Sequence, residues 1–328
     1  MKRTLLFICT LFCANVLMAQ EQLAVLKHND STSVFYGQSA FEQAYTAATH
    51  GDIITLSDGI FSAPQYVQKG ITVRGNGAVV DTARKSTGTY FMEAFSVSNL
   101  GDSLQFSAEG IYFDRFNVTN SLGIKLTKCY IESIGKVQDA QITNCIILKG
   151  SISPTTESSN TFLNCIVKDV SWVNSTNGNS YFLPTYSNCT NCILIGKNYS
   201  SSITALYNNC IIINPNSANT LSETSINSVL IGFTGTNSPA SSGNVVMSLS
   251  DVFENWDGES LPTDLETYVL KSSVSDSIQS LDGTEVGIFG GFMPFEWRPS
   301  YSIIKRFNVA NRTTADGKLS VDIEVISE

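Results

Sequence analysis

The sequence contains little charge, few basic side chains and almost no histidine. Only 15% of the 328 residues are Asp, Glu, Lys or Arg, and the formal net charge is −9. Proteins that bind nucleic acid displace counterions from phosphates with Lys and Arg, so this shortage argues against a nucleic-acid partner. The two histidines, His28 and His50, both precede the repeated region described below, so that region offers no histidine for a metal site.

Long hydrophobic runs are also missing after the first twenty residues. Lys2 and Arg3 precede an apolar run from Leu5 to Leu17, which is the arrangement of a secretory signal peptide. That run is too short for a stable membrane span, and no later segment reaches spanning length. We expect cleavage near Ala19 and export of a soluble protein to the periplasm, the outer surface or the extracellular space.

A short phrase recurs through the middle of the chain: an Asn, a Cys or Ser, and then a run of Ile, Leu or Val. Its Cys-position residues follow one another at intervals of 16, 20, 27, 18 and 18 residues. A degenerate copy, Lys128-Cys129-Tyr130-Ile131, precedes five copies that begin at Asn144, Asn164, Asn191, Asn209 and Asn227. A strand-like phrase at this spacing predicts a solenoid, in which each repeat forms one coil of a stack.

The two ends of this expected solenoid resemble a known fold family. A helical pattern over residues 39–50 precedes the phrases GDIITL (51–56) and KGITVRGNG (69–77), and the phrase DGTEVGIFGG (282–291) comes near the end. The opening resembles right-handed parallel β-helix proteins of the pectate-lyase-like superfamily. The closing phrase is similar to that of secreted Gram-negative bacterial β-helix proteins of unknown function. The resemblance extends from about residue 35 to residue 295 and implies three short strands per coil.

We therefore expect an all-β protein: a right-handed parallel β-helix with an N-terminal capping helix and an extended C-terminal tail. The expected parts are a signal peptide (1–19), a β-helix domain (20–295, cap helix about 39–50) and a C-terminal strand or tail (296–328). A helix at the first coil would cover apolar core that the stack otherwise exposes. The loose alternation of apolar residues over 319–325 predicts an extended tail, which we expect to cover the far end of the stack.

The asparagines of the repeat are predicted to form a structural ladder. Asn tolerates the left-handed conformation of a sharp bend better than most other non-glycine residues. Stacked Asn side chains can also hydrogen-bond to the coils above and below. The ladder should begin at Lys128 and contain Asn144, Asn164, Asn191, Asn209 and Asn227.

Six cysteines follow the expected leader. In an exported protein an even number permits disulfides, and Cys189 with Cys192 has the CxxC spacing of a zinc or redox site. Five of the six, however, occupy the same place in successive repeats, and Cys189 aligns with Leu126, Ile142 and Phe162. We expect buried free thiols that fill the core, with zinc or redox chemistry as the alternative.

Catalytic groups are sparse in the repeats. Lyases of this fold need clustered acids for calcium and a basic residue, and hydrolases need paired carboxylates. Glu132 and Asp169 have similar positions two coils apart, and Lys168 is the base that could join them. We identify no catalytic residue, no metal ligand and no cofactor, and calcium stays open, as does zinc at Cys189 and Cys192.

Aromatic residues around the longest interruption of the repeat favour a binding role. Sugars bind to exposed aromatic faces beside polar groups, although the same rings could pack this loop onto the solenoid. The candidate carbohydrate contacts are Trp172, Tyr181, Tyr186 and Tyr199. The expected function is non-catalytic glycan binding or a structural role at the cell surface or in the periplasm. The alternative is a polysaccharide lyase or glycoside hydrolase that acts on uronate-containing polysaccharide. The expected partner is a polysaccharide or surface glycan, and the oligomeric state is open.

Overall fold

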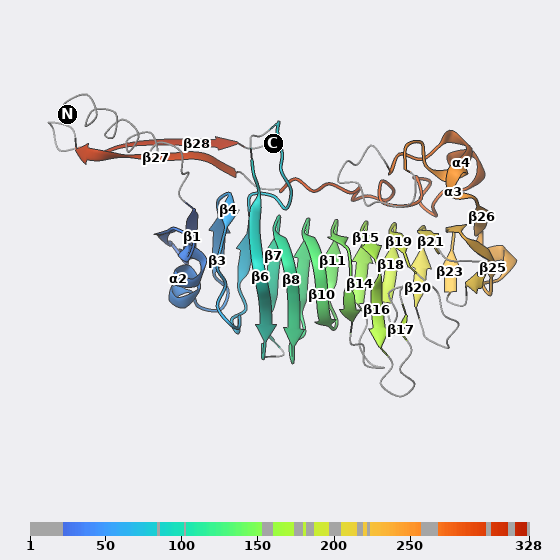
Figure 1. Cartoon of the computed structure of the whole chain (residues 1–328), viewed down its shortest axis with the longest axis horizontal. Coiled ribbons are helices and arrows are strands. Elements are labelled where there is room, and N and C mark those ends of the chain that lie inside the picture. The colour runs from blue at the N-terminus through green and yellow to red at the C-terminus, as the bar shows by residue number, and fades with distance from the viewer. Residues whose placement is uncertain are drawn as a thin grey trace, which may run out of the picture.

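The chain forms a parallel β-solenoid of about eight turns (Figure 1). The all-β solenoid predicted from the repeat is thereby confirmed. The predicted signal peptide, residues 1–19, lies outside the residues that the structure describes. This computed structural model describes residues 22–83, 86–101, 103–152, 160–173, 180–181, 187–196, 205–214, 219–221, 224–256, 268–299, 303–313 and 319–326.

Two sheets run along the solenoid. The parallel strands of sheet A are β3 (Ile53–Leu56), β5 (Thr72–Arg74), β7 (Phe106–Glu109), β9 (Ile124–Thr127), β11 (Gln141–Thr143), β14 (Asn160–Leu163), β18 (Ser187–Thr190), β20 (Leu206–Asn208) and β23 (Thr224–Ile226). Sheet B contains β4 (Gly59–Ile60), β6 (Thr89–Ser98), β8 (Tyr112–Thr119), β10 (Tyr130–Val137), β12 (Ile146–Ile147), β13 (Gly150–Ile152), β15 (Ile166–Lys168), β16 (Val170–Val173), β17 (Ser180–Tyr181), β19 (Ile193–Ile195), β21 (Ile211–Ile213), β24 (Val229–Ile231) and β26 (Val245–Met247). A small parallel pair, β22 (Asn219–Leu221) and β25 (Phe233–Thr236), and the 3-10 helix η1 (Ala240–Ser242) accompany the last coils.

The first coil is covered by two elements. Strands β1 (Leu23–His28) and β2 (Ser31–Tyr36) form a hairpin that adds antiparallel to β3, and this hairpin was not predicted. Helix α2 (Ala40–Ala47) lies within the predicted range 39–50 and buries Phe41. The ring of Phe41 lies 5.1 Å from that of Phe91 and 5.7 Å from that of Phe95, centroid to centroid. The helix therefore packs on the apolar core at the open end of the stack.

The left-handed bend predicted at each asparagine is present. The φ angles of Asn144, Asn164, Asn191, Asn209 and Asn227 are 52°, 48°, 53°, 54° and 45°, and that of Lys128 is 53°. The expected bonds between stacked amides are absent among the described residues: the Oδ1 atoms of Asn144, Asn164 and Asn191 are buried without a hydrogen-bond partner. The expectation of mutual bonding was wrong because the amides turn toward a different segment, which is described below.

The cysteines fill the core as predicted. All six described cysteines are buried and free, and Cys189 pairs in register with Phe162 and Tyr207 in sheet A. In the repeated position, the backbone N–H of Cys145 donates to Sγ of Cys165 at 3.5 Å. The N–H of Cys129 donates in the same way to Cys145 at 3.4 Å, and that of Cys165 to Cys192 at 3.5 Å. The N–H of Cys210 donates to Oγ of Ser228 at 3.1 Å, so this position requires a small side chain that can accept.

We expect the native protein to resist thiol reagents. All six thiols are buried, so a reagent reaches them only when the protein opens, and burial also raises the pKa of Cys145, Cys189 and Cys192. Titration of the mature protein with an aromatic disulfide reagent should detect no fast-reacting thiol before unfolding and six after it. A count below six in denaturant without reductant would show that disulfides form.

The C-terminal part of the chain runs back along the outside of sheet B. After α3 (Leu249–Val252) and α4 (Ser272–Ser277), residues 278–298, here called the strap, return from the last coils toward the first ones (Figure 1). Strap residues Ile278, Val286, Ile288 and Phe295 are buried in one cluster with an outward row of sheet B. That row contributes one aliphatic side chain per coil: Ile146, Ile166, Ile193, Ile211 and Val229.

The asparagine ladder holds this strap. Nδ2 of Asn164 donates to the carbonyl oxygens of Ile288 and Gly290, both at 2.8 Å. Nδ2 of Asn144 donates to Pro294 O at 3.3 Å. At the start of the ladder, Nζ of Lys128 donates to Arg298 O at 2.6 Å, and at its end Nδ2 of Asn227 donates to Gln279 O at 3.3 Å. The ladder side chains thus bind strap carbonyls from one end of the strap to the other.

The expected C-terminal tail is a hairpin. Strands β27 (Ile303–Thr313) and β28 (Leu319–Ile326) pair antiparallel, and within the described chain they pair with no other strand. Figure 1 shows the hairpin at the N-terminal end of the solenoid. The expectation that this segment covers the far end was therefore wrong, because the strap has already carried the chain back. None of the helices in the described ranges is long and apolar enough to cross a membrane.

Candidate functional site

The outward row of sheet B that contains Ile146 changes from aliphatic to aromatic side chains where the strap ends. In register with Ile146, the three preceding coils present Tyr130, Tyr112 and Tyr90, here called the tyrosine row. The ring of Tyr112 lies 5.2 Å from each of its two neighbours, centroid to centroid. All three rings are partly exposed. One continuous row is thus aliphatic and covered in the later coils but aromatic and open in the earlier ones.

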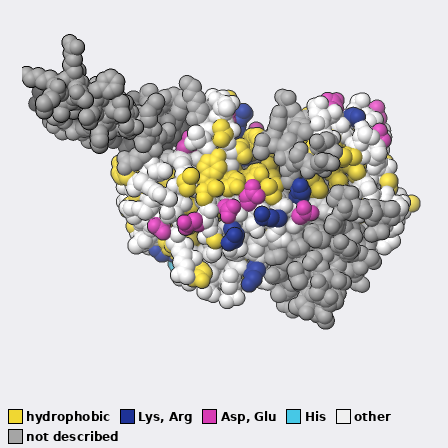
Figure 2. All heavy atoms as spheres, in the orientation of Figure 1, with side chains coloured by type: hydrophobic (Ala, Val, Ile, Leu, Met, Phe, Trp, Pro, Cys, Tyr) yellow, Lys and Arg dark blue, Asp and Glu magenta, His cyan; other side chains and the backbone are white. Residues whose placement is uncertain are grey.

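A groove of about 520 Å³ lies over the tyrosine row and is here called the tyrosine groove. Its other walls are residues 78–80 of a loop and Trp297 at the end of the strap. Val80 is 60% exposed, so one wall presents apolar surface to solvent. Figure 2 shows hydrophobic side chains in a band over this part of sheet B, with acidic and basic side chains along one margin. A concave apolar surface with a few polar groups is typical of a ligand site.

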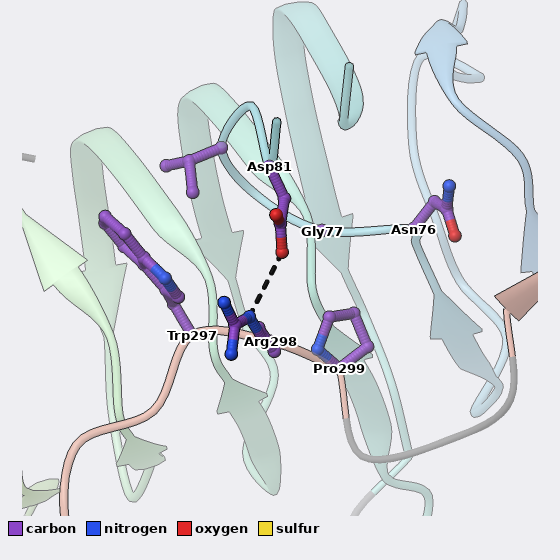
Figure 3. Close-up of a pocket in the computed structure, with 7 residues that line it drawn as sticks. Asn76, Gly77, Asp81, Trp297, Arg298 and Pro299 are labelled. Atoms are coloured by element: carbon purple, nitrogen blue, oxygen red, sulfur yellow. Dashed lines mark hydrogen bonds and ion pairs between the residues drawn. The ribbon is translucent and has the colours of Figure 1, made fainter. Parts of the chain in front are cut away.

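Polar contacts fix the walls of the groove. Oδ1 of Asp58 accepts hydrogen bonds from Asn76 Nδ2 at 2.6 Å and Ser86 Oγ at 2.7 Å, which joins the two ends of the loop. Nε of Arg298 lies 3.1 Å from Oδ2 of Asp81, and this ion pair connects the loop to the strap (Figure 3). The groove is therefore built by segments that are more than 200 residues apart, since Asp81 and Arg298 differ by 217 positions.

A row of carboxylates runs beside the tyrosine row. Asp114 and Glu132 each lie two residues after a tyrosine, and the flanking strand pairs give them equivalent positions in neighbouring coils. Glu93 lies in a bulge of β6 opposite Asp114. Oε1 of Glu132 accepts a hydrogen bond from the hydroxyl of Tyr112 at 3.3 Å. Tyrosine rings thus line the groove, and a row of carboxylates lies beside it.

The tyrosine hydroxyls stay protonated across the physiological pH range. Burial raises the pKa of Tyr112, and the charge and hydrogen bond of Glu132 raise it further. Burial and the Glu132 charge also raise the pKa of Tyr130, and burial and the Asp58 charge raise that of Tyr90. Neutral phenols keep both a hydrogen to donate and lone pairs to accept, which suits a ligand rich in hydroxyl groups.

The tyrosine row was missed in the sequence, although a signal for it exists. Each tyrosine comes directly before an inward core residue: Tyr90 before Phe91, Tyr112 before Phe113 and Tyr130 before Ile131. The separation of Asp114 from Glu132 is 18 residues, the commonest step of the repeat. Only the coil register shows that these residues share one face.

The predicted carbohydrate contacts remain predictions. The backbones of Trp172 and Tyr181 are opposite each other in the antiparallel pair β16–β17, but their side chains lie outside the described part of the structure. Tyr186 and Tyr199 lie entirely outside the described residues.

The three residues whose convergence would favour the enzyme alternative, Glu132, Asp169 and Lys168, are not brought together. The strand register places Lys168 in line with Glu132, but the coil of β12 with Leu148 lies between them. At about 4.8 Å per coil their backbones are about 10 Å apart. Asp169 follows at a left-handed bend with a φ of 47°. The near carboxylate partner of Glu132 is Asp114 instead. Within the described ranges, no three His, Cys, Asp or Glu side chains are grouped to hold a metal ion.

No protein-family model matches the chain, and no curated protein matches its sequence. The class of this protein is defined here by its fold and its candidate site. It is a parallel β-solenoid whose outward sheet B row is covered by a strap in the later coils and forms an open tyrosine groove in the earlier ones.

Proposed function

We propose that the protein is an exported, glycan-binding solenoid whose ligand lies in the tyrosine groove. The observation that carries this proposal is the open row of Tyr90, Tyr112 and Tyr130, whose ring centroids follow one another at 5.2 Å beside Trp297. A sugar ring has apolar C–H faces and polar edges, so it needs aromatic surface and hydrogen-bonding groups together. The tyrosine rings supply the aromatic surface of the groove, and Glu132, whose Oε1 accepts a hydrogen bond from the Tyr112 hydroxyl, supplies a hydrogen-bonding group beside it.

The geometry of the row suits a linear chain of sugars. Neighbouring coils of a parallel β structure are about 4.8 Å apart, which is close to the length of one pyranose unit in an extended polysaccharide. A chain that follows the solenoid axis can therefore place one ring on each tyrosine. Beyond Tyr130 the same row passes under the strap at Ile146, so the groove accommodates a short stretch of about three or four sugars.

The proposal also includes export of the protein and a right-handed β-helix as the specific form of the solenoid. The n-region and apolar run of residues 1–19 support export to the periplasm, the outer surface or the extracellular space. The phrases at residues 51–77 and 282–291 support a right-handed β-helix of the pectate-lyase-like superfamily.

Retention on polysaccharide tests the proposal. The mature protein would be run through affinity gels that contain neutral, amino-sugar or uronate polysaccharides. We expect retardation in at least one gel, and loss of that retardation when Tyr112 is replaced by alanine. If the folded wild-type protein migrates freely in every gel, the glycan-binding role is wrong.

A glycoside hydrolase is the second candidate, and the Asp114–Glu132 pair favours it. Hydrolases use two carboxylates between about 5 and 9.5 Å apart, and equivalent positions in neighbouring coils permit such a spacing. The substitution Glu132→Gln distinguishes the two roles, because it removes the acid but keeps the shape of the groove. A hydrolase would release reducing ends from the retained polysaccharide only with Glu132 present. A binding protein would release none in either form.

A further inference from the structure

We infer that the glycan of the tyrosine groove is neutral or carries amino groups, and that polyuronates are excluded from it. This inference rests on the glycan-binding role proposed above and adds the chemical class of the ligand. It is carried by the charges beside the groove: Asp114 and Glu132 occupy neighbouring positions along the tyrosine row, and Glu93 lies in the bulge opposite Asp114. Asp58 approaches the same row at Tyr90.

Two basic groups near the groove, Arg298 and Lys128, are engaged by the protein itself. Nε of Arg298 lies 3.1 Å from the Asp81 carboxylate, and Nζ of Lys128 donates to the carbonyl of Arg298 at 2.6 Å. Arg115 follows Asp114 but belongs to the register of Ala94 and Ser133, one position farther from the tyrosines. A uronate chain laid on the tyrosine row would therefore meet carboxylates before it meets a cation.

The negative charge beside the tyrosine row should weaken the binding of acidic sugars and strengthen the binding of amino sugars. A uronate carries one carboxylate on every sugar, so a stretch of three or four sugars on the row would place like charges beside Asp114 and Glu132. An amino sugar would instead place ammonium groups near the same side chains, where they can form charge-assisted hydrogen bonds. A neutral sugar meets neither effect. Burial is the largest cause of the raised pKa values of Tyr112 and Tyr130, and the Glu132 charge adds to it.

Calcium is the usual means by which an acidic protein surface binds a polyuronate. Such a bridge needs clustered oxygen ligands from the protein. In the described part of the chain no three acidic side chains are grouped to hold an ion. We therefore expect the discrimination against uronates to persist when calcium is supplied.

Calorimetric titration with oligosaccharides of equal length tests the inference. The probes are neutral β-1,4-linked glucose tetramers, β-1,4-linked glucosamine tetramers and galacturonate tetramers, each with EDTA and with calcium. We expect the galacturonate tetramer to bind at least about tenfold more weakly than the better of the other two, in both conditions. If it binds within a factor of about three of that ligand, or more tightly, the inference is overturned.

Charge variants provide a second readout. The double variant Asp114→Asn/Glu132→Gln should bind the galacturonate tetramer more tightly, so that its affinity comes closer to that of the better of the other two tetramers. If the wild type binds the glucosamine tetramer, the double variant should bind it more weakly and with less dependence on salt. Glu254→Gln is the matched control, because Glu254 is an exposed acid near the last coils and should leave all affinities unchanged. Galacturonate affinity that is unchanged in the double variant would show that these carboxylates do not select the ligand.

If no tetramer binds although a polysaccharide gel retains the protein, the groove is not its binding site and the inference is overturned. If neither tetramers nor polysaccharides bind, the proposed function itself fails.

Discussion

Replacing Asn164 by alanine should lower the free energy of unfolding by about 3 kcal/mol. Asn164 is fully buried, has a φ of 48° and donates to two strap carbonyls at 2.8 Å. Alanine in the left-handed conformation costs about 1–2 kcal/mol. Each lost hydrogen bond adds about 0.5–1.5 kcal/mol, and the buried oxygens of Ile288 and Gly290 would be left without this donor.

Matched variants separate the two parts of this loss. Asn164→Gly removes the side chain but tolerates the bend, so it should cost about 1–2 kcal/mol less than alanine. Asn120→Ala is the control for the backbone, because Asn120 has a φ of 49° and is exposed away from the strap. Urea unfolding followed by circular dichroism measures all three changes. An Asn164→Ala protein as stable as Asn120→Ala would show that the strap contacts contribute nothing.

Replacing Tyr112 by alanine should weaken glycan binding by roughly thirtyfold, or about 2 kcal/mol. Tyr112 is the central ring of the row, and its centroid lies 5.2 Å from those of both neighbours. Its loss removes the middle of the apolar surface and also the hydrogen bond to Glu132. Tyr112→Phe keeps the ring and should lose only a few-fold of the affinity, because a single neutral donor contributes about 1 kcal/mol.

The binding change must be distinguished from a change in folding. Tyr66→Ala is the matched control, because Tyr66 is 49% exposed and does not line the groove. Both alanine variants should unfold within a few degrees of the wild type, and only Tyr112→Ala should lose retention on the affinity gel. Equal retention of the two variants would contradict a ligand on the tyrosine row. The variant Trp172→Ala, run in the same gels, tests whether the carbohydrate contact predicted from the sequence at Trp172 contributes to retention.

The features that repeat in every coil were predictable from the sequence. The interval of the Asn-Cys phrase predicts the solenoid, and strand alternation places Cys189 in line with Phe162, where β14 and β18 pair them. The left-handed bends of the later coils follow in the same way, because asparagine stands where sheet A passes to sheet B in each copy of the phrase after Lys128. Each of these features lies within one coil, so the spacing of the repeated phrase is enough to predict it.

The strap and the groove could not be predicted in this way. Asn164 binds Ile288 and Gly290, which are 124 and 126 residues later and outside the repeat. The tyrosines lie in coils where the Asn-Cys phrase is degenerate or missing, so no repeated residue shows their alignment. The groove also needs Trp297, which reaches it only because the strap returns along sheet B. These contacts depend on how distant segments pack.

The central claim is that the tyrosine groove binds a glycan. A crystal structure of the mature protein with an oligosaccharide cut from the polysaccharide that retains it tests this claim most directly. The account predicts sugar rings stacked on Tyr90, Tyr112 and Tyr130, with hydroxyl groups bonded to Glu132. Sugar bound at strands β16 and β17, beside Trp172 and Tyr181, with the tyrosine row left bare, would contradict it.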